Sequence, residues 1–149
     1  MKDIHKENIL FLVHVEEMFR QYFPDKMYVH RLIRACQAKK YDRVFLMISG
    51  VEDYQPIREL VAVTGQHQYI NWSWGYEVDM FDDDEKQWII PAYGHEWTWV
   101  PPELRDHIDA FKNANVFVGG GCKYECLRDF IDVLEYLEIG YEKINGYIY

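Results

Sequence analysis

The sequence predicts an α/β fold, a three-layer Rossmann-like domain with a mostly parallel sheet of about five strands. Short apolar runs alternate along the chain with segments whose apolar residues recur at helical spacing. Strands that are apolar throughout are typical of a parallel sheet covered by helices on both faces. The glycine run Gly119–Gly121 separates one such strand from an amphipathic helix, which is the order of a βα unit.

The 149 residues suit a single domain over positions 1–149, and a hydrophobic content of 49% is sufficient for a packed core. The net charge of −9 argues against a nucleic-acid partner, because a phosphate-binding surface needs clustered Lys and Arg. No apolar run is long enough to span a bilayer, so no membrane partner is expected. The odd number of cysteines and the polar first residues favour a reducing, cytoplasmic location with free thiols.

The first half of the chain contains two predicted strands, each followed by a helix. Ile9–Val15 and Arg43–Ser49 are apolar runs, and His14 interrupts the first of them near its end. The apolar spacing predicts a helix over roughly Met27–Lys40 after the first strand. A short helix over Pro56–Val63 follows the second strand, because proline favours the first turn of a helix.

The middle of the chain is less regular, and the βα pattern returns near the glycine run. His67–Tyr76 is expected to form an edge strand or a loop, and Asp79–Glu85 a solvated acidic turn. Trp88–Ile90 reads as a short strand that Pro91 ends, and Tyr93–Val100 as an aromatic loop or hairpin. The remaining elements are a helix starting at Pro101-Pro102, a strand over Val116–Val118, a helix with apolar residues from Leu127 to Leu137, and a final strand over Tyr141–Tyr149.

Cys126 is the first candidate catalytic residue, because it lies in the first turn of the helix after the glycine run. The helix dipole and the free N–H groups at this position favour a thiolate, which is the nucleophilic form of cysteine. His14 ends the first strand, at the edge where open α/β sheets bind ligands, and can act as a base. Glu17 can orient the imidazole. The alternatives are a buried small hydrophobe for Cys126, a satisfied strand-end residue for His14 and a solvated carboxylate for Glu17.

Gly119, Gly120 and Gly121 are candidate ligand-binding residues. Their backbone N–H groups can cradle a phosphate at a helix start, and Lys123 adds one positive charge. A tight turn explains the same glycines without any ligand. Cys122 and Cys126 are spaced C-x-x-x-C rather than the C-x-x-C of zinc and redox sites, so the sequence indicates no metal and no cofactor.

Two aromatic-rich stretches supply further candidate binding residues, because aromatic side chains line ligand pockets and subunit interfaces. We interpret them as a pocket wall that stacks on a planar ligand and as a homo-oligomer interface, with core packing as the alternative. The residues are Trp72, Trp74, Tyr93, His95, Trp97 and Trp99.

The chain resembles the isochorismatase-like cysteine hydrolases, which include nicotinamidases. Leu12–Phe19 is similar to the family's first strand, which typically ends in Asp-Val-Gln-x-x-Phe, and Val118–Leu127 is similar to its glycine turn and cysteine-bearing helix start. The tail Leu137–Tyr141 looks like the family's last helix end and closing strand. The resemblance implies an isochorismatase-like fold for the whole chain.

The resemblance also places Cys126 at the position of the family's nucleophile. Family members combine this cysteine with an aspartate that takes its proton and a lysine that lowers its pKa. Here His14 stands where the aspartate would be, and no lysine occurs near Ile90–Tyr93, where one would be expected.

These departures favour a catalytically degenerate protein that binds a small molecule, such as a nucleotide- or nicotinamide-like compound. The second hypothesis is a cysteine-dependent hydrolase of a small amide or related substrate, with Cys126 as nucleophile. The third is a protein–protein interaction module that uses its acidic, aromatic surface. A fold alone does not decide between these functions.

Overall fold

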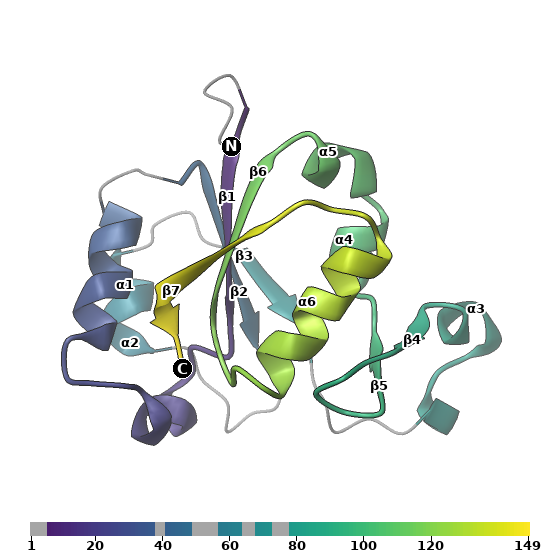
Figure 1. The fold of residues 1–149 in the computed structure, drawn as a ribbon, viewed down its shortest axis with the longest axis horizontal. Helices are drawn as coiled ribbons and strands as arrows, with labels where there is room; N and C mark the ends of the chain where they lie inside the picture. Colours follow the sequence, from purple (N-terminus) through teal and green to yellow (C-terminus); the bar gives the residue numbers. More distant parts are fainter. Residues whose placement is uncertain (1–5, 38–40, 49–56, 64–67, 73–77) are drawn as a thin grey trace.

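The computed structural model describes residues 6–37, 41–48, 57–63, 68–72 and 78–149. A five-stranded sheet is the middle layer of an α/β fold and is covered by helices on both faces (Figure 1). One face carries α1 (Tyr28–Gln37) and α2 (Arg58–Val63). The other face carries α4 (Pro102–Arg105), α5 (Ile108–Lys112) and α6 (Cys126–Tyr136). The prediction of a three-layer, mostly parallel α/β fold is therefore confirmed.

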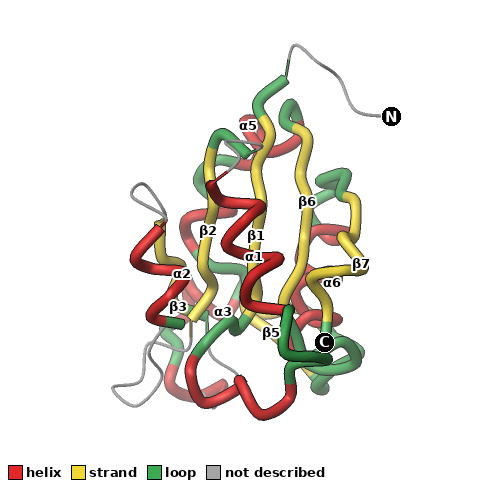
Figure 2. The backbone as a smooth tube through the Cα atoms, turned by 90° about the vertical axis from the view of Figure 1, so that its left-hand side faces the viewer, coloured by secondary structure: helices red, strands yellow, loops and turns green. Residues whose placement is uncertain are grey.

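All five strands of this sheet are parallel, in the order β3-β2-β1-β6-β7, and Figure 2 shows them side by side behind α1. The chain builds β1, β2 and β3 toward one edge and then crosses to the other side of β1 to form β6 and β7. The strand order therefore reverses between β1 and β6. The strands span Asn8–Val13 (β1), Arg43–Ile48 (β2), Gln68–Asn71 (β3), Asn115–Gly120 (β6) and Glu142–Ile148 (β7).

Strand β1 lies in the centre of the sheet and contributes to both faces, because successive side chains of a strand point to opposite sides. Ile9, Phe11 and Val13 belong to the apolar cluster on the side of α6. Leu10 and Leu12 belong to the cluster on the side of α1 and α2. All five side chains are fully buried, which explains why the strand is apolar throughout rather than alternating.

Helix α6 packs on the sheet with the helical periodicity predicted from the sequence. Leu127, Phe130, Ile131 and Leu134 are buried, and their spacing places them on one face. The helix expected from Pro101 onward is instead two short helices, α4 and α5. The backbone leaves helical geometry at His107, with φ of −133°, and then starts again.

A short antiparallel hairpin lies beside α6, at the lower right of Figure 1, together with two short helices. Glu85 anchors this region, because its carboxylate accepts hydrogen bonds from Arg105 Nη2 at 2.6 Å and from Trp99 Nε1 at 3.1 Å. The bond from Arg105 lowers the pKa of Glu85, so this part of the acidic stretch is tied to the fold rather than simply solvated. The elements are β4 (Ile89–Pro91), β5 (Trp97–Trp99), η2 (Val78–Met80) and α3 (Asp83–Lys86).

Candidate functional site

The candidate site lies at the carboxyl edge of the sheet, where β1 and β6 end next to each other. Val13 pairs with Gly120 across the two strands, and the Gly121 N–H donates to the Val13 carbonyl at 2.8 Å. Open α/β sheets bind ligands at this edge, where the strand order reverses. His14 follows β1 and Cys126 begins α6, so the fold brings both predicted residues to the same edge.

His14 and Glu16 form a buried pair at this edge. The imidazole Nδ1 lies 2.6 Å from Glu16 Oε1, and the two side chains are 1% and 0% exposed. His14 has a φ of 53°, which turns the chain sharply after β1 and directs Glu16 back toward the imidazole. The rings of Phe19 and Trp72 pack against the imidazole, with centroids 5.4 and 6.0 Å away. A carboxylate at Nδ1 fixes the orientation of the ring and favours a proton on that nitrogen.

The imidazole of His14 is therefore oriented by Glu16 and not, as the sequence suggested, by Glu17. Glu17 begins the 3₁₀ helix η1 (Glu17–Tyr22) and accepts hydrogen bonds from Arg20 Nε and from the Arg58 backbone N–H, both at 3.0 Å. The Arg20 bond lowers the pKa of Glu17. Glu17 thus joins η1 to the start of α2 at the surface and does not take part in the His14 pair.

Cys126 lies in the apolar cluster on the α6 side of the sheet and is 8% exposed. Burial raises the pKa of its thiol, and the negative charges of Asp129, Glu125 and Glu16 raise it further. The burial and the raised pKa of Cys126 disfavour the thiolate form on which its predicted role as a nucleophile depends.

Cys122 precedes α6 and is partly exposed, and like Cys36 and Cys126 it is a free thiol. Burial and the neighbouring carboxylate of Glu125 raise its pKa as well. Among the residues that the structure describes, no three His, Cys, Asp or Glu side chains are grouped to hold a metal ion.

A second histidine–carboxylate pair joins α6 to the β4–β5 hairpin. His95 Nδ1 is 2.5 Å from Asp129 Oδ2, with the histidine side chain 34% exposed and the aspartate 4% exposed. Asp129 Oδ1 also accepts the backbone N–H groups of Gly94 and His95, at 2.8 and 3.0 Å. Next to it, Asp132 Oδ2 accepts the Tyr93 N–H at 2.8 Å. Two carboxylates of α6 thus hold the turn of the β4–β5 hairpin.

The sequence analysis did not single out Asp129 and Asp132 as site residues, although their positions in the helix could have indicated a special role. Both are buried in the middle of the amphipathic helix α6, where a solvated aspartate would be exposed. Burial raises the pKa of Asp129, while the hydrogen bond from His95 acts in the opposite direction. A polar residue that is buried in a helix indicates a fixed partner elsewhere in the chain.

Other parts of the chain occupy the space next to the three glycines, so this space is not open for a phosphate. Gly119 and Gly120 belong to β6, and a Cβ at Gly119 would lie 2.7 Å from the Cβ of Tyr147. Gly120 has a φ of 91°, and a Cβ there would overlap the backbone of Val13. A Cβ at Gly121 would lie 2.5 Å from the ring of Tyr149. The glycines therefore allow close packing at the end of the sheet. This agrees with the alternative that they have a structural role and need no ligand.

The backbone N–H groups after the glycines are also bonded within the chain. The Lys123 N–H donates to the Tyr149 carbonyl at 2.6 Å, and the Tyr149 N–H donates to the Gly120 carbonyl at 3.0 Å. The Tyr149 hydroxyl donates to the His14 carbonyl at 2.6 Å. Tyr149 therefore closes the edge of the sheet between His14 and the glycine run.

The aromatic residues predicted as a pocket wall have different environments. Trp72 is 3% exposed, and its Nε1 donates to the Trp99 carbonyl at 2.9 Å. Trp97 is partly buried in β5, whereas Tyr93 is 85% exposed at the hairpin turn. Trp74 lies outside the described residues. Trp72 is the member of this group that packs on the His14 ring, with centroids 6.0 Å apart.

Comparison with models of known families, with curated proteins and with solved structures found no match. Within the described part of the chain, no helix is both long and apolar enough to cross a membrane.

Proposed function

We propose that this protein binds a small, planar, polar molecule at the carboxyl edge of its parallel sheet, next to the His14–Glu16 pair. The observation that carries the proposal is the burial of this pair at the strand-order reversal. Burying a histidine and a glutamate costs free energy, and apolar side chains of similar size are often equally or more stable in such a position. A fold that needed only a core would not require these two residues.

The backbone at His14 supports the same interpretation. A non-glycine residue with φ of 53° costs on the order of 1 kcal/mol or more, and such strain gathers at binding and active sites. The strain places the Glu16 carboxylate on the imidazole, so the two unfavourable features produce one polar group of fixed orientation. The adjacent Trp72 ring lies nearly parallel to the imidazole, at an interplanar angle of 17°, and packs against it, which helps to fix the plane of the imidazole.

Binding is favoured over hydrolysis by the state of Cys126. A cysteine hydrolase needs a thiolate, and here burial and three carboxylates keep the thiol protonated at neutral pH. We therefore propose a nucleotide- or nicotinamide-like ligand that is held by hydrogen bonds, with no covalent step at Cys126.

A thermal-shift experiment on the whole chain tests the proposal, with nicotinamide and nicotinate as probes, because neither carries a phosphate. A ligand that binds only the native state raises its stability, by about 2.7 kcal/mol when present at a hundredfold excess over its dissociation constant. We expect at least one probe to raise the Tm of the wild type, and Glu16→Gln to abolish the shift because it removes the charge that polarises His14.

The matched control is His30→Gln, which removes an exposed imidazole from α1 and should leave the shift unchanged. Urea unfolding of each variant shows whether the fold is retained. Absence of any shift in the wild type, or an equal shift in folded Glu16→Gln, would contradict the proposal.

A further inference from the structure

A groove of about 450 Å³ runs between α6 and β7 and is separate from the His14–Glu16 pair. Its apolar side chains are those of Leu127, Ile131 and Ile148. Lys123, Arg128 and Lys143 also line it, together with Tyr124 and Asn145, and no carboxylate does. A groove lined by three cationic side chains and no acidic one is unexpected in a chain with a net charge of −9.

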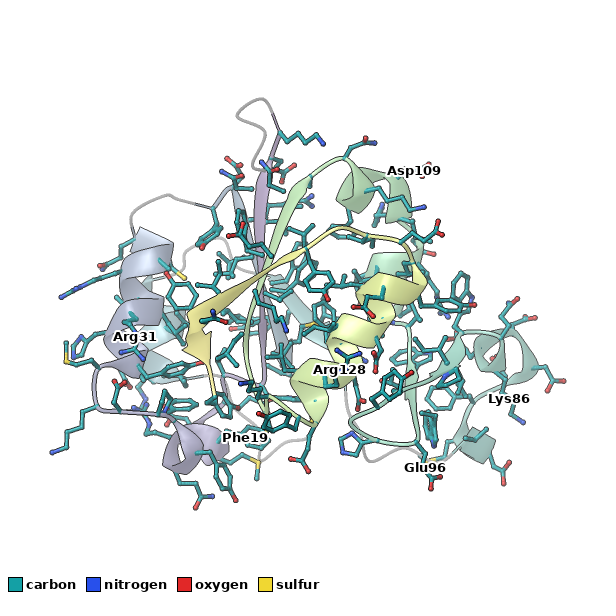
Figure 3. All side chains as sticks on the ribbon, in the orientation of Figure 1. Phe19, Arg31, Lys86, Glu96, Asp109 and Arg128 are labelled. Atoms are coloured by element: carbon teal, nitrogen blue, oxygen red, sulfur yellow. The ribbon has the colours of Figure 1, made fainter. Side chains whose placement is uncertain are left out.

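The cations of the groove differ in how far they are neutralised. Arg128 Nη2 lies 3.0 Å from Asp132 Oδ1, and the guanidinium lies over the ring of Tyr93 at 5.2 Å. Figure 3 shows Arg128 on the side of α6 that faces the viewer. Arg128 is thus fixed in place and its charge is largely offset.

The positive charges of Lys123 and Lys143 are not offset by a carboxylate in this way. Within the described part of the chain, no carboxylate lies within 4.0 Å of the ammonium group of Lys123 or Lys143. The ammonium group of Lys123 lies over the ring of its neighbour Tyr124, at 5.2 Å. By contrast, Arg20, Arg31 and Arg105 all have carboxylate partners. The net positive charge of the groove therefore comes from the two lysines.

The two lysines belong to different elements, since Lys123 precedes α6 and Lys143 lies in β7. A ligand in the groove meets one ammonium group from each element, which suits an anion that carries two charges. Lysine binds phosphate as a compact point charge, and the amide of Asn145 and the hydroxyl of Tyr124 add hydrogen-bond donors. The apolar side chains suit the organic part of such a ligand, and the volume is that of a small-molecule pocket.

We propose that the groove between α6 and β7 binds the phosphate of a small phosphorylated molecule, with Lys123 and Lys143 as its principal contacts. The site is distinct from the proposed ligand site at the end of β1, because the groove includes neither His14 nor Glu16. Either proposal can fail without the other.

Isothermal titration of the whole chain tests this site, with pyrophosphate, AMP and adenosine as probes. We expect saturable binding of pyrophosphate that weakens as NaCl is raised, because salt screens exposed charges. Lys123→Gln/Lys143→Gln should bind it about a hundredfold more weakly, which corresponds to about tenfold for each charge-assisted contact. AMP should bind in the same variant-dependent way, and adenosine, which lacks the phosphate, should not.

The matched control is Lys26→Gln/Lys86→Gln, which makes the same change in net charge outside the groove; Lys86 is labelled in Figure 3, far from Arg128. Its affinity should stay within about twofold of the wild type. Equal weakening in the two double variants would show unspecific attraction and overturn the proposal. It would also be overturned by absence of saturable binding up to about 10 mM pyrophosphate, a concentration that detects even weak sites. Loss of AMP binding in Glu16→Gln but not in Lys123→Gln/Lys143→Gln would assign the nucleotide to the other site and overturn this one.

Discussion

The hydroxyl of Tyr149 donates a hydrogen bond to the backbone carbonyl of His14, at 2.6 Å and across 135 positions of the chain. The Tyr149 ring also packs against Phe23 and Tyr28, with centroids 5.1 and 5.9 Å away. Because His14 has a left-handed backbone, its carbonyl lies outside the regular ladder of the sheet and needs a separate donor. Tyr149 supplies that donor and so helps to hold the histidine in its strained geometry.

Replacing Tyr149 by phenylalanine should therefore destabilise the fold by about 1 kcal/mol, the usual net value of a hydrogen bond to a buried carbonyl. The ring contacts remain in Tyr149→Phe, so the change isolates the hydroxyl. Urea unfolding followed by tryptophan fluorescence measures the difference. Tyr124→Phe is the control, because that side chain is 76% exposed, and it should change stability little. Equal effects of the two changes would show that the bond to His14 contributes nothing.

A second prediction concerns Gly120, where an added Cβ would overlap the backbone of Val13 and φ is 91°. Gly120→Ala should destabilise the protein by about 3 kcal/mol or more, because β1 and β6 must separate and the left-handed backbone is strained. At Gly140, by contrast, an added Cβ meets no atom within 4 Å. Gly140→Ala should be neutral or slightly stabilising, since alanine restricts the unfolded chain. Thermal unfolding of the two variants checks the contrast, and similar Tm values would refute it.

A third prediction concerns pH, because burial raises the pKa of Cys126. Below the ordinary thiol value of about 8.5 the folded and unfolded states both keep the proton, so the contribution of Cys126 to stability is constant. Above that pH the unfolded state loses its proton first, and stability falls by up to about 1.4 kcal/mol per pH unit for this thiol. Free energies of unfolding measured from pH 8 to 10 should therefore decline more steeply in the wild type than in Cys126→Ala.

The raised pKa of the Cys126 thiol also predicts how fast this residue reacts with an alkylating reagent. At pH 8, iodoacetamide should label Cys126 far more slowly in the native protein than in urea, because only the thiolate attacks. Peptide mapping after timed labelling distinguishes Cys126 from Cys122 and Cys36. Rapid labelling of Cys126 in the native state, together with parallel stability slopes, would instead support an activated nucleophile.

The order of strands and helices could be predicted from the sequence because it depends on local patterns. A central parallel strand must be apolar on both faces, as β1 is, and α6 shows its buried face in the spacing of its leucines and phenylalanine. The division of the Pro101 helix into α4 and α5 was not predicted, because the intervening residues carry no glycine or proline to mark it.

The details of the site depend on backbone conformation and on long-range contacts, which sequence patterns do not show. Glu16 and Glu17 are adjacent, and only the left-handed turn at His14 determines which carboxylate reaches the imidazole. The glycine run suggested a phosphate cradle because nothing near it in sequence reveals that Tyr147 and Tyr149 fill the space. Those tyrosines reach the glycines through an irregular pairing of β7 with β6, which no periodicity predicts.

The last prediction concerns Asp129, which joins the β4–β5 hairpin to α6 through three hydrogen bonds. Its carboxylate accepts from the backbone of Gly94 and His95 and pairs with the His95 imidazole. Asp129→Ala leaves the two partly buried N–H groups without this acceptor, and an unsatisfied group costs about 1–3 kcal/mol when it is fully buried. We expect the free energy of unfolding in urea to fall by about 2–4 kcal/mol, and amide exchange at residues 93–96 to become faster because the turn is released from the helix.

Asp109→Ala is the control for Asp129→Ala: it removes an exposed aspartate, labelled in Figure 3, from the short helix α5. It should cost no more than about 0.5 kcal/mol and leave exchange in the hairpin unchanged. If both variants exchange like the wild type over residues 93–96, the hairpin is held by its packing on α6 and not by the carboxylate.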